Sequence, residues 1–203
     1  MMAFTTAFSK SMLEQIRRWL LLLAFVPVWA WTAEVVVDNA QISTGDEGYV
    51  LSADFSFELN QRLEGTVSKG VMLYFVADFE LTKDRWYWLD EKLVSRSLTY
   101  RLSYHALTRQ YRLSTGGGLH QSFSSLSEAM SMLSRLRNWV VIDKGDKGIK
   151  VGEPYQAALR LRLDIAQLPK PFQITSLGNK DWSLSSDWNT WQATLPALTV
   201  DSK

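Results

Sequence analysis

The sequence predicts an α+β fold that is mostly antiparallel β, a sandwich- or barrel-like sheet of roughly eight to ten strands with one clear helix and one short helix. Three observations predict this class. Short runs that alternate apolar and polar residues recur along the chain, separated by Gly-, Asp- and Asn-containing turns. One run in the first half is apolar on both faces, as in a central strand. One segment with helical spacing of apolar residues begins with a capping box.

The first two strands are expected at residues 34–43 and 49–59, as a hairpin closed by a turn that contains two glycines. In the second run, apolar residues alternate with Ser, Asp and Glu, so one face is buried and the other is solvated. Asn60 stands at the position of a helix N-cap and predicts a short helix that ends near Gly70.

Three further strands are expected before the middle of the chain. Residues 71–81 are apolar on both faces at first and then alternate, which indicates a central strand. A short strand follows at residues 85–89, with Trp86 and Trp88 on one face. After another turn, a long strand is expected to end near Tyr104.

This long strand is expected to form a hairpin across the connection 105–108. The register would pair Tyr104 with Arg109 and place Arg101 directly opposite Arg112. Like charges at opposed positions are unfavourable, so an anion is expected beside them. It is either a carboxylate of a neighbouring strand or an external anion, such as an acidic protein surface. The internal candidates on polar faces are Asp54, Glu58, Asp78 and Glu80.

The second half is expected to contain the clear helix and five strands. Ser125 and Glu128 form the capping box of a helix that is expected to extend to Arg137. The triple glycine at 116–118 is read as a wide turn or bulge between two strands. The expected strands are residues 139–142, 155–163, 172–176, 182–188 and 191–195, of which the last two would form a hairpin.

The N-terminal segment has the order of a secretory signal, with basic residues, the apolar run WLLLLAFVPVW and a small residue at Ala30. The apolar run is about half of the roughly 20 residues that a membrane-spanning helix needs. We therefore expect a signal peptide at 1–30, a single β-rich domain at 31–195 and a tail at 196–203, with the mature protein in the periplasm and not inserted in the membrane. The alternatives are a buried or amphipathic N-terminal helix, an uncleaved short anchor, or, given the pair Arg17 and Arg18, a twin-arginine signal.

Composition and motifs give little support to catalysis. The formal charge is +1, from 22 Lys and Arg and 21 Asp and Glu, and no basic run concentrates it, so a nucleic-acid partner is not expected. Cysteine is absent, which excludes disulfides and thiolate metal sites. His105 and His120 lack metal-binding spacing, and no serine lies in a nucleophile motif. We expect no catalytic residue, no metal and no cofactor.

The candidate interaction surface combines the paired cations with aromatic residues. Seven of the nine tryptophans lie beyond residue 30. Buried tryptophans would be core, whereas exposed ones could stack on a sugar or contact a partner. The residues proposed for this surface are Arg101, Arg112, Trp86, Trp88 and His120.

Four segments carry a resemblance to a known family. They are LYFVADFELTKDRWYWLDEK (73–92), TYRLSYHALTRQYRLSTGGGLHQSF (99–123), YQAALRLRLDIAQLPKPFQ (155–173) and DWSLSSDW (181–188). These segments resemble the proteobacterial exported family catalogued as domain of unknown function 4390. The resemblance implies an N-terminal signal and genes that often lie beside a two-component system of the nitrogen-regulation type, with a membrane sensor kinase. It implies no activity, cofactor or catalytic residue. The triple glycine departs from the double glycine that is more usual in the family.

Three hypotheses of function follow. The first is an exported, non-catalytic envelope protein that acts as an interaction module, with the extracytoplasmic part of a nitrogen-regulation-type sensor kinase as candidate partner. The second is a periplasmic binder of an apolar or glycan ligand, suggested by the tryptophans and the two-faced apolar strand. The third is an envelope hydrolase, which would need His105 or His120 beside a serine or carboxylate in a cleft.

Overall fold

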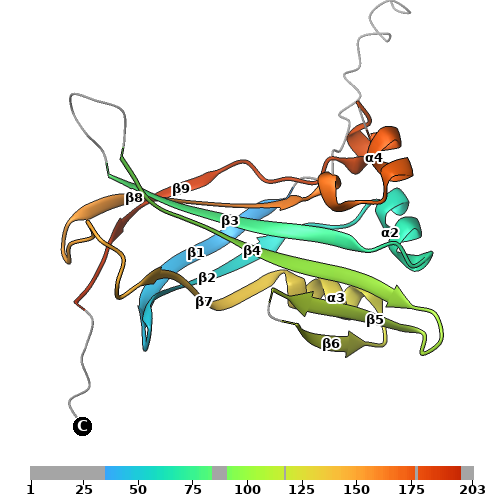
Figure 1. The fold of residues 1–203 in the computed structure, drawn as a ribbon, viewed down its shortest axis with the longest axis horizontal. Helices are drawn as coiled ribbons and strands as arrows, with labels where there is room; N and C mark the ends of the chain where they lie inside the picture. Colours follow the sequence, from blue (N-terminus) through green and yellow to red (C-terminus); the bar gives the residue numbers. More distant parts are fainter. Residues whose placement is uncertain (1–34, 84–90, 117, 177, 198–203) are drawn as a thin grey trace, which may run out of the picture. The chain divides into compact units, whose positions relative to one another are not determined.

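The structure is mostly antiparallel β, as predicted, and contains two sheets (Figure 1). It is a computed structural model that describes residues 35–83, 91–116, 118–176 and 178–197. The expected signal peptide and the expected strand with Trp86 and Trp88 lie outside the described residues. Three α-helices occur in the described part of the chain, one more than expected. None of the helices described is long and apolar enough to cross a membrane.

The smaller sheet has three strands in the order β1-β2-β7. Its strands are β1 (Val36–Gly45), β2 (Gly48–Ser56) and β7 (Arg135–Asp143). The predicted hairpin of the first two strands is confirmed, and it closes with Gly45 opposite Gly48. β7 then adds to the other side of β2, so β2 is the central strand of this sheet.

The larger sheet has six strands in the order β6-β5-β4-β3-β8-β9. They are β3 (Leu73–Lys83), β4 (Glu91–His105), β5 (Gln110–Thr115), β6 (Leu119–Phe123), β8 (Pro154–Leu163) and β9 (Asn189–Thr194). β3 is central, as predicted, because β4 and β8 pair with its two edges over most of its length.

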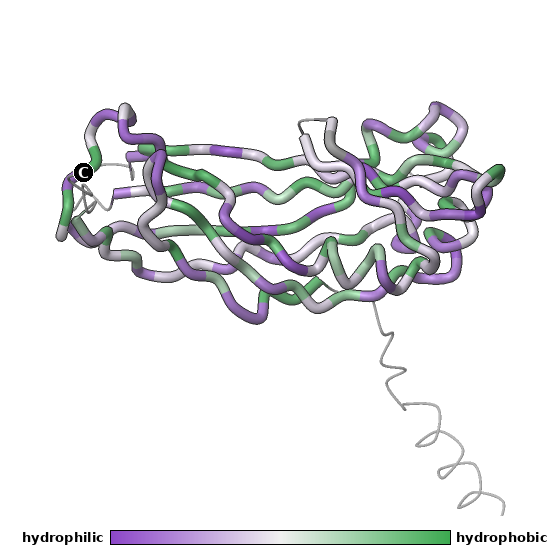
Figure 2. Tube along the Cα trace, turned by 90° about the horizontal axis from the view of Figure 1, so that it is seen from below, coloured by the Kyte–Doolittle hydropathy of each residue, from purple (hydrophilic) through white to green (hydrophobic). Residues whose placement is uncertain are grey.

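A single core fills the space between the inner faces of the two sheets. Alternate residues of β3 point into it and are fully buried, and alternate residues of β8 do the same. On β3 these residues are Leu73, Phe75, Ala77, Phe79 and Leu81. The ring of Phe79 meets that of Trp139 on β7 edge-to-face at 6.4 Å, which ties the sheets together. Figure 2 shows the resulting alternation of hydrophobic and hydrophilic residues along the strands.

The two expected helices begin at their predicted caps. In α2 (Gln61–Ser68) the side chain of Asn60 accepts a hydrogen bond from the backbone of Leu63. In α3 (Leu126–Leu133) the Ser125 hydroxyl accepts from the Glu128 backbone at 3.2 Å, and the Glu128 carboxylate accepts from the Ser124 backbone.

The prediction that this second helix extends to Arg137 is wrong, because it ends at Leu133. The Ser134 hydroxyl donates to the carbonyl of Met130 at 2.9 Å, which satisfies an acceptor at the helix end. The Ser134 carbonyl accepts from the backbone of Phe55 at 2.9 Å, which draws the chain onto β2. β7 therefore begins at Arg135, inside the segment expected to be helical.

The strand expected at 172–176 is also wrong, since Lys170–Ser176 is the helix α4. Pro171 lies in its first turn, where the missing amide hydrogen costs nothing. The carbonyl of Pro169 accepts from the backbone of Phe172 at 2.9 Å and starts the helix. The pair Pro169 and Pro171 suits a helix start as well as a break before a strand.

No terminal hairpin forms from residues 182–188 and 191–195. Residues 180–182 are the short helix η2 (Lys180–Trp182), and the residues after it lie along β8. The backbone of Leu163 donates to Leu184 at 2.7 Å, and the buried Ser186 hydroxyl accepts from the backbone of Leu161 at 3.0 Å. The segment and β9 thus cover the same edge of β8 in succession, so neither pairs with the other.

Two glycines give a stability test of this architecture. A Cβ on Gly48, which has a φ of +151°, would lie 2.0 Å from the carbonyl oxygen of Ile142 on β7. We expect Gly48→Ala to lower the free energy of unfolding by more than about 2 kcal/mol, because the β2–β7 ladder must open. Gly65 in α2 has open space at its Cβ, so Gly65→Ala should raise it by about 0.5–1 kcal/mol. Urea unfolding of both variants measures these changes. A loss of stability in Gly65→Ala equal to that in Gly48→Ala would contradict the close contact between Gly48 and β7.

Candidate functional site

The outer face of the six-stranded sheet is polar and consists of two different halves. On β3, the residues of this face alternate with the buried core residues. In the half formed by β3 and β8, cations and carboxylates pair with one another. In the half formed by β4, β5 and β6, two arginines lack a carboxylate partner among the described residues. The half formed by β4, β5 and β6 is the candidate site. We call the half formed by β3 and β8, in which opposite charges pair, the balanced half.

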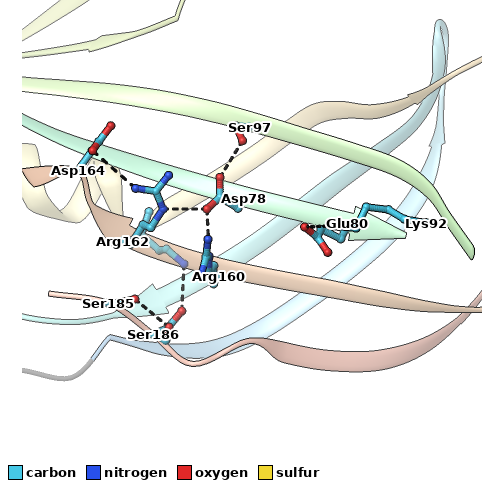
Figure 3. Close-up of polar contacts among 10 residues, drawn as sticks. Asp78, Glu80, Lys92, Ser97, Arg160, Arg162, Asp164, Ser185 and Ser186 are labelled. Carbon is cyan, nitrogen blue, oxygen red and sulfur yellow. Dashed lines mark hydrogen bonds and ion pairs between the residues drawn. The ribbon is translucent and has the colours of Figure 1, made fainter. Parts of the chain in front are cut away.

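In the balanced half, one carboxylate holds two guanidinium groups (Figure 3). Asp78 on β3 is only 8% exposed and lies between Ser97 on β4 and Arg160 on β8 in the strand register. The Nε atoms of Arg160 and Arg162 donate to its Oδ2 at 3.0 and 2.9 Å. The hydroxyl of Ser97 donates to Oδ1 at 2.7 Å. One buried carboxylate therefore joins three adjacent strands.

The environment of Asp78 favours its charged form. Burial by itself would raise the pKa of this carboxyl. The hydrogen bonds from Ser97, Arg162 and Arg160 outweigh burial and hold the pKa below the ordinary value of 3.8. Arg160 also lies with its guanidinium carbon 4.4 Å from the centre of the Trp188 ring, a cation–π arrangement. These arginines are already satisfied and offer little to a partner.

The register of the β4–β5 hairpin differs from the prediction by two residues. Tyr104 pairs with Tyr111, and their rings lie 4.9 Å apart. Arg109, expected in the ladder, instead closes the turn with a φ of +52°, in the left-handed region. Arg101 is therefore not opposite Arg112 but opposite Ser114, and Arg112 is opposite Ser103.

Both arginines still lie on the outer face, as diagonal neighbours, where side chains are about 7–8 Å apart. β6 adds His120 opposite Ser114. We call these residues the arginine face; they are Arg101, Ser103, Arg112, Ser114 and His120. Three of the five residues proposed for interaction from the sequence thus come together, while Trp86 and Trp88 lie outside the described residues.

The cations of the arginine face have few partners. Arg101 is exposed, and its Nε donates only to the hydroxyl of Ser114 at 3.3 Å. The Nε of Arg112 is buried and makes no hydrogen bond to a described residue. None of the four expected carboxylates forms an ion pair with either arginine in the described part of the chain. Three of them have other partners: Asp78 binds Arg160 and Arg162, Glu80 binds Lys92, and Asp54 binds Arg137.

The sequence contains a signal for this surface that was missed. Residues 92–127 include no Asp or Glu at all, but five Lys or Arg and two His. The segment spans nearly all of β4, all of β5 and β6, and the start of α3. The signal is a long stretch without acidic residues, not a run of adjacent basic ones.

A cleft of about 890 Å³ opens on the other side of the same strands. Its wall on the six-stranded sheet includes Leu98, Tyr100 and Leu113, and its other wall belongs to β7 and the end of α3. Burial raises the pKa of Tyr100 to about 12, so its hydroxyl remains a neutral donor at physiological pH. Trp139 lines this cleft, whereas Trp182 is fully buried in the core.

The two histidines lie on different elements, His105 at the end of β4 and His120 on β6. His105 begins the β4–β5 turn, where its Nδ1 lies 3.1 Å from the hydroxyl of Thr108. His120 is exposed and makes no hydrogen bond through its side chain to the residues described. No group of three His, Asp or Glu residues that could hold a metal ion occurs within the described ranges.

Comparison with known proteins gives one match. A family model described as Domain of unknown function (DUF4390) matches residues 32–192, which confirms the resemblance seen in the four sequence segments. No curated protein and no solved structure matches the chain.

The balanced half of the face yields a prediction. Asp78→Asn removes the charge that holds Arg160 and Arg162, and it should lower the free energy of unfolding at pH 7 by about 2 kcal/mol. Glu80→Gln, on the same strand and face, breaks only the exposed pair with Lys92 and should cost less than about 1 kcal/mol. Urea titration of both variants measures the difference, and equal losses would refute the role given to Asp78.

The pH dependence of this effect has a definite sign. Because the pKa of Asp78 is lowered in the folded state, its stabilisation is complete above the unfolded value of 3.8 and is lost as the pH falls through the folded value. The stability gap between wild type and Asp78→Asn should therefore narrow from about pH 5 toward about pH 2. If the difference in unfolding free energy between wild type and Asp78→Asn widened as the pH falls, the lowered pKa of Asp78 would be contradicted.

Proposed function

The chain belongs to the DUF4390 family, and from this premise we propose that it is an exported, non-catalytic interaction module of the bacterial envelope that docks an acidic protein surface on its arginine face. The observation that carries the proposal is the pair Arg101 and Arg112. Both lie on one flat face of the sheet, without a carboxylate among the described residues.

Without a carboxylate partner, Arg101 and Arg112 reduce the stability of the isolated protein. Diagonal like charges repel one another, and the buried Nε of Arg112 lacks the hydrogen bond that it would have in water. An unsatisfied buried donor of this kind costs about 1–3 kcal/mol. A partner carboxylate would relieve the repulsion between the two charges, because guanidinium groups bind carboxylates through charge-assisted hydrogen bonds.

The charges around the two arginines also favour association with an acidic surface. Residues 92–127 contain no Asp or Glu, and of their five Lys and Arg only Lys92 and Arg96 pair with carboxylates elsewhere in the described part of the chain, so Arg101, Arg109 and Arg112 supply the positive potential over β4, β5 and β6. Such a field increases the rate of encounter with an acidic surface and makes it sensitive to ionic strength. A nucleic-acid partner is disfavoured, because the whole chain has a formal charge of only +1.

Location and partner extend the proposal. The N-terminal pattern of basic residues, apolar run and small residue supports export to the periplasm. Within that compartment, we propose the extracytoplasmic part of a nitrogen-regulation-type sensor kinase as the partner, because genes of this family often lie beside one. The family resemblance supports this choice of partner, whereas the arginine face supports only its acidic chemistry.

Site-specific crosslinking in cells tests the proposal. A photo-crosslinking amino acid at Ser122, which is exposed and opposite Arg112, should capture a defined partner from the periplasmic side. The same group at Thr190, on the same face of the sheet but on its far edge strand, should capture it at least about tenfold less efficiently. Mass spectrometry identifies the partner, whose contact peptide should be rich in Asp and Glu.

A charge-matched pair of variants provides the control. Arg101→Gln/Arg112→Gln should reduce capture at Ser122 by about tenfold or more, since two charge-assisted contacts are lost. Lys144→Gln/Lys147→Gln removes two exposed cations outside the arginine face and should leave capture unchanged. Far-UV circular dichroism verifies that each variant is folded. Equal capture by both double variants, or a contact peptide without acidic residues, would refute the proposal.

A further inference from the structure

We infer that the cleft between β7 and the inner face of β4, β5 and β6 binds a single-chain amphiphile with an anionic head group, of the fatty-acid class. This ligand site is independent of the arginine face, which lies on the opposite side of the same strands. The inference rests on the shape of the cleft, its apolar depth and one free cation at its mouth.

The cleft exists because the two sheets differ in width. The smaller sheet ends at β7, whereas the larger sheet continues through β5 and β6. Over that extension, the inner face is covered by α3, a helix of only eight residues (Figure 1). The space left between α3, β7 and the larger sheet is about 890 Å³, within the range of about 300–1,000 Å³ that is typical of small-molecule sites.

The depth of the cleft suits a hydrocarbon chain. Leu98, Leu113 and Leu136 line it together with the rings of Tyr100 and Trp139. Met132 at the end of α3 lines it too, and is 43% exposed despite being apolar. Flexible methionine side chains adapt to ligands of variable shape. An alkyl chain would remove this apolar surface from water, which favours binding.

The described residues that line the cleft include two arginines, Arg135 and Arg137, and no Asp or Glu, although Asp54 on β2 is opposite Arg135 in the strand register. Arg137 is already occupied, since its guanidinium binds Asp54 and donates to the carbonyl of Ala53 at 2.8 Å. Arg135 is exposed and has no ion pair or side-chain hydrogen bond with a described residue. The hydroxyl of Tyr100, a residue 6% exposed, also has no hydrogen-bond partner among the residues described. A free cation and an unused donor around an apolar cleft are complementary to one carboxylate on an alkyl chain.

The backbone of β7 bulges within the wall of the cleft. The register against β2 shifts between Leu51 and Ala53, and Asn138 adopts a φ of +51° at that bulge. Its amide donates to the hydroxyl of Ser52 at 3.4 Å instead of entering a regular ladder. The bulge falls within the cleft wall, where it separates Arg135 and Arg137 from Trp139.

Tryptophan quenching by a brominated ligand tests the inference on the full-length chain. Monomeric ω-bromododecanoate should quench fluorescence saturably, because its bromine end would reach Trp139 in the apolar depth. The quenched amplitude should fall by at least about half in Trp139→Phe, while the affinity measured by calorimetry stays within about twofold. No saturable quenching in the wild type, or an unchanged amplitude in Trp139→Phe, would overturn the inference.

Two variants test the head group and the cleft separately. Arg135→Gln should weaken dodecanoate binding about tenfold and leave dodecanol binding unchanged, because only the charged head group loses a partner. Leu98→Trp fills the cleft and should weaken both ligands by about tenfold or more, with circular dichroism showing that the fold persists. Equal weakening of dodecanoate and dodecanol by Arg135→Gln would overturn the assignment of the head group, and undiminished binding by folded Leu98→Trp would overturn the cleft.

A final comparison separates this site from the arginine face and from membranes. Arg101→Gln/Arg112→Gln should bind dodecanoate as the wild type does, because those residues lie on the other side of the sheet. Weakened binding by that variant would place the anion on the arginine face and overturn the inference. Binding to phosphatidylglycerol vesicles without binding of monomeric dodecanoate would overturn it as well. Failure of the ligand assay leaves the crosslinking result unaffected, so the two proposals fail independently.

Discussion

The fold depends on β3, the strand that lies between β4 and β8 in the larger sheet. Its inner residues from Leu73 to Leu81 are fully buried, so the core between the sheets is built on it. Its outer face carries Asp78, whose carboxylate binds Ser97 on β4 and Arg160 and Arg162 on β8. Because successive side chains of a strand point to opposite faces, this one strand separates an apolar interior from a charged exterior.

That separation produces both candidate sites. On the exterior, the two arginines of β8 find a carboxylate in the adjacent strand, while β4, β5 and β6 supply none to Arg101 and Arg112. In the interior, the larger sheet extends past β7, and a short helix covers the remainder incompletely. The same three strands thus carry an unbalanced charge on one side and an open apolar cleft on the other. An acidic partner and an amphiphilic ligand are the complements of these two features.

Most strands could be predicted from the sequence, because their alternation records which face is buried. The hairpin of β1 and β2, the central position of β3 and the strand expected at 155–163, which is β8, are confirmed for this reason. The predictions are wrong where something other than the local alternation of residues determines a helix end or a strand register. α3 ends early because Ser134 binds Phe55, a residue far away in the sequence. The register of the β4–β5 hairpin depends on a left-handed Arg109, a conformation that arginine rarely adopts and that no local pattern announces. The prediction that both arginines share one face is therefore confirmed, whereas their predicted pairing is wrong.

The central claim is that Arg101 and Arg112 are not used by the fold itself. Its most direct test is the free energy of unfolding of Arg101→Gln/Arg112→Gln relative to the wild type, measured in urea on the purified chain. Two arginines without an internal carboxylate should be replaceable at no loss, so the account predicts a value within about 0.5 kcal/mol of the wild type or above it. A loss of more than about 2 kcal/mol would show that an internal anion pairs with them and would contradict the account.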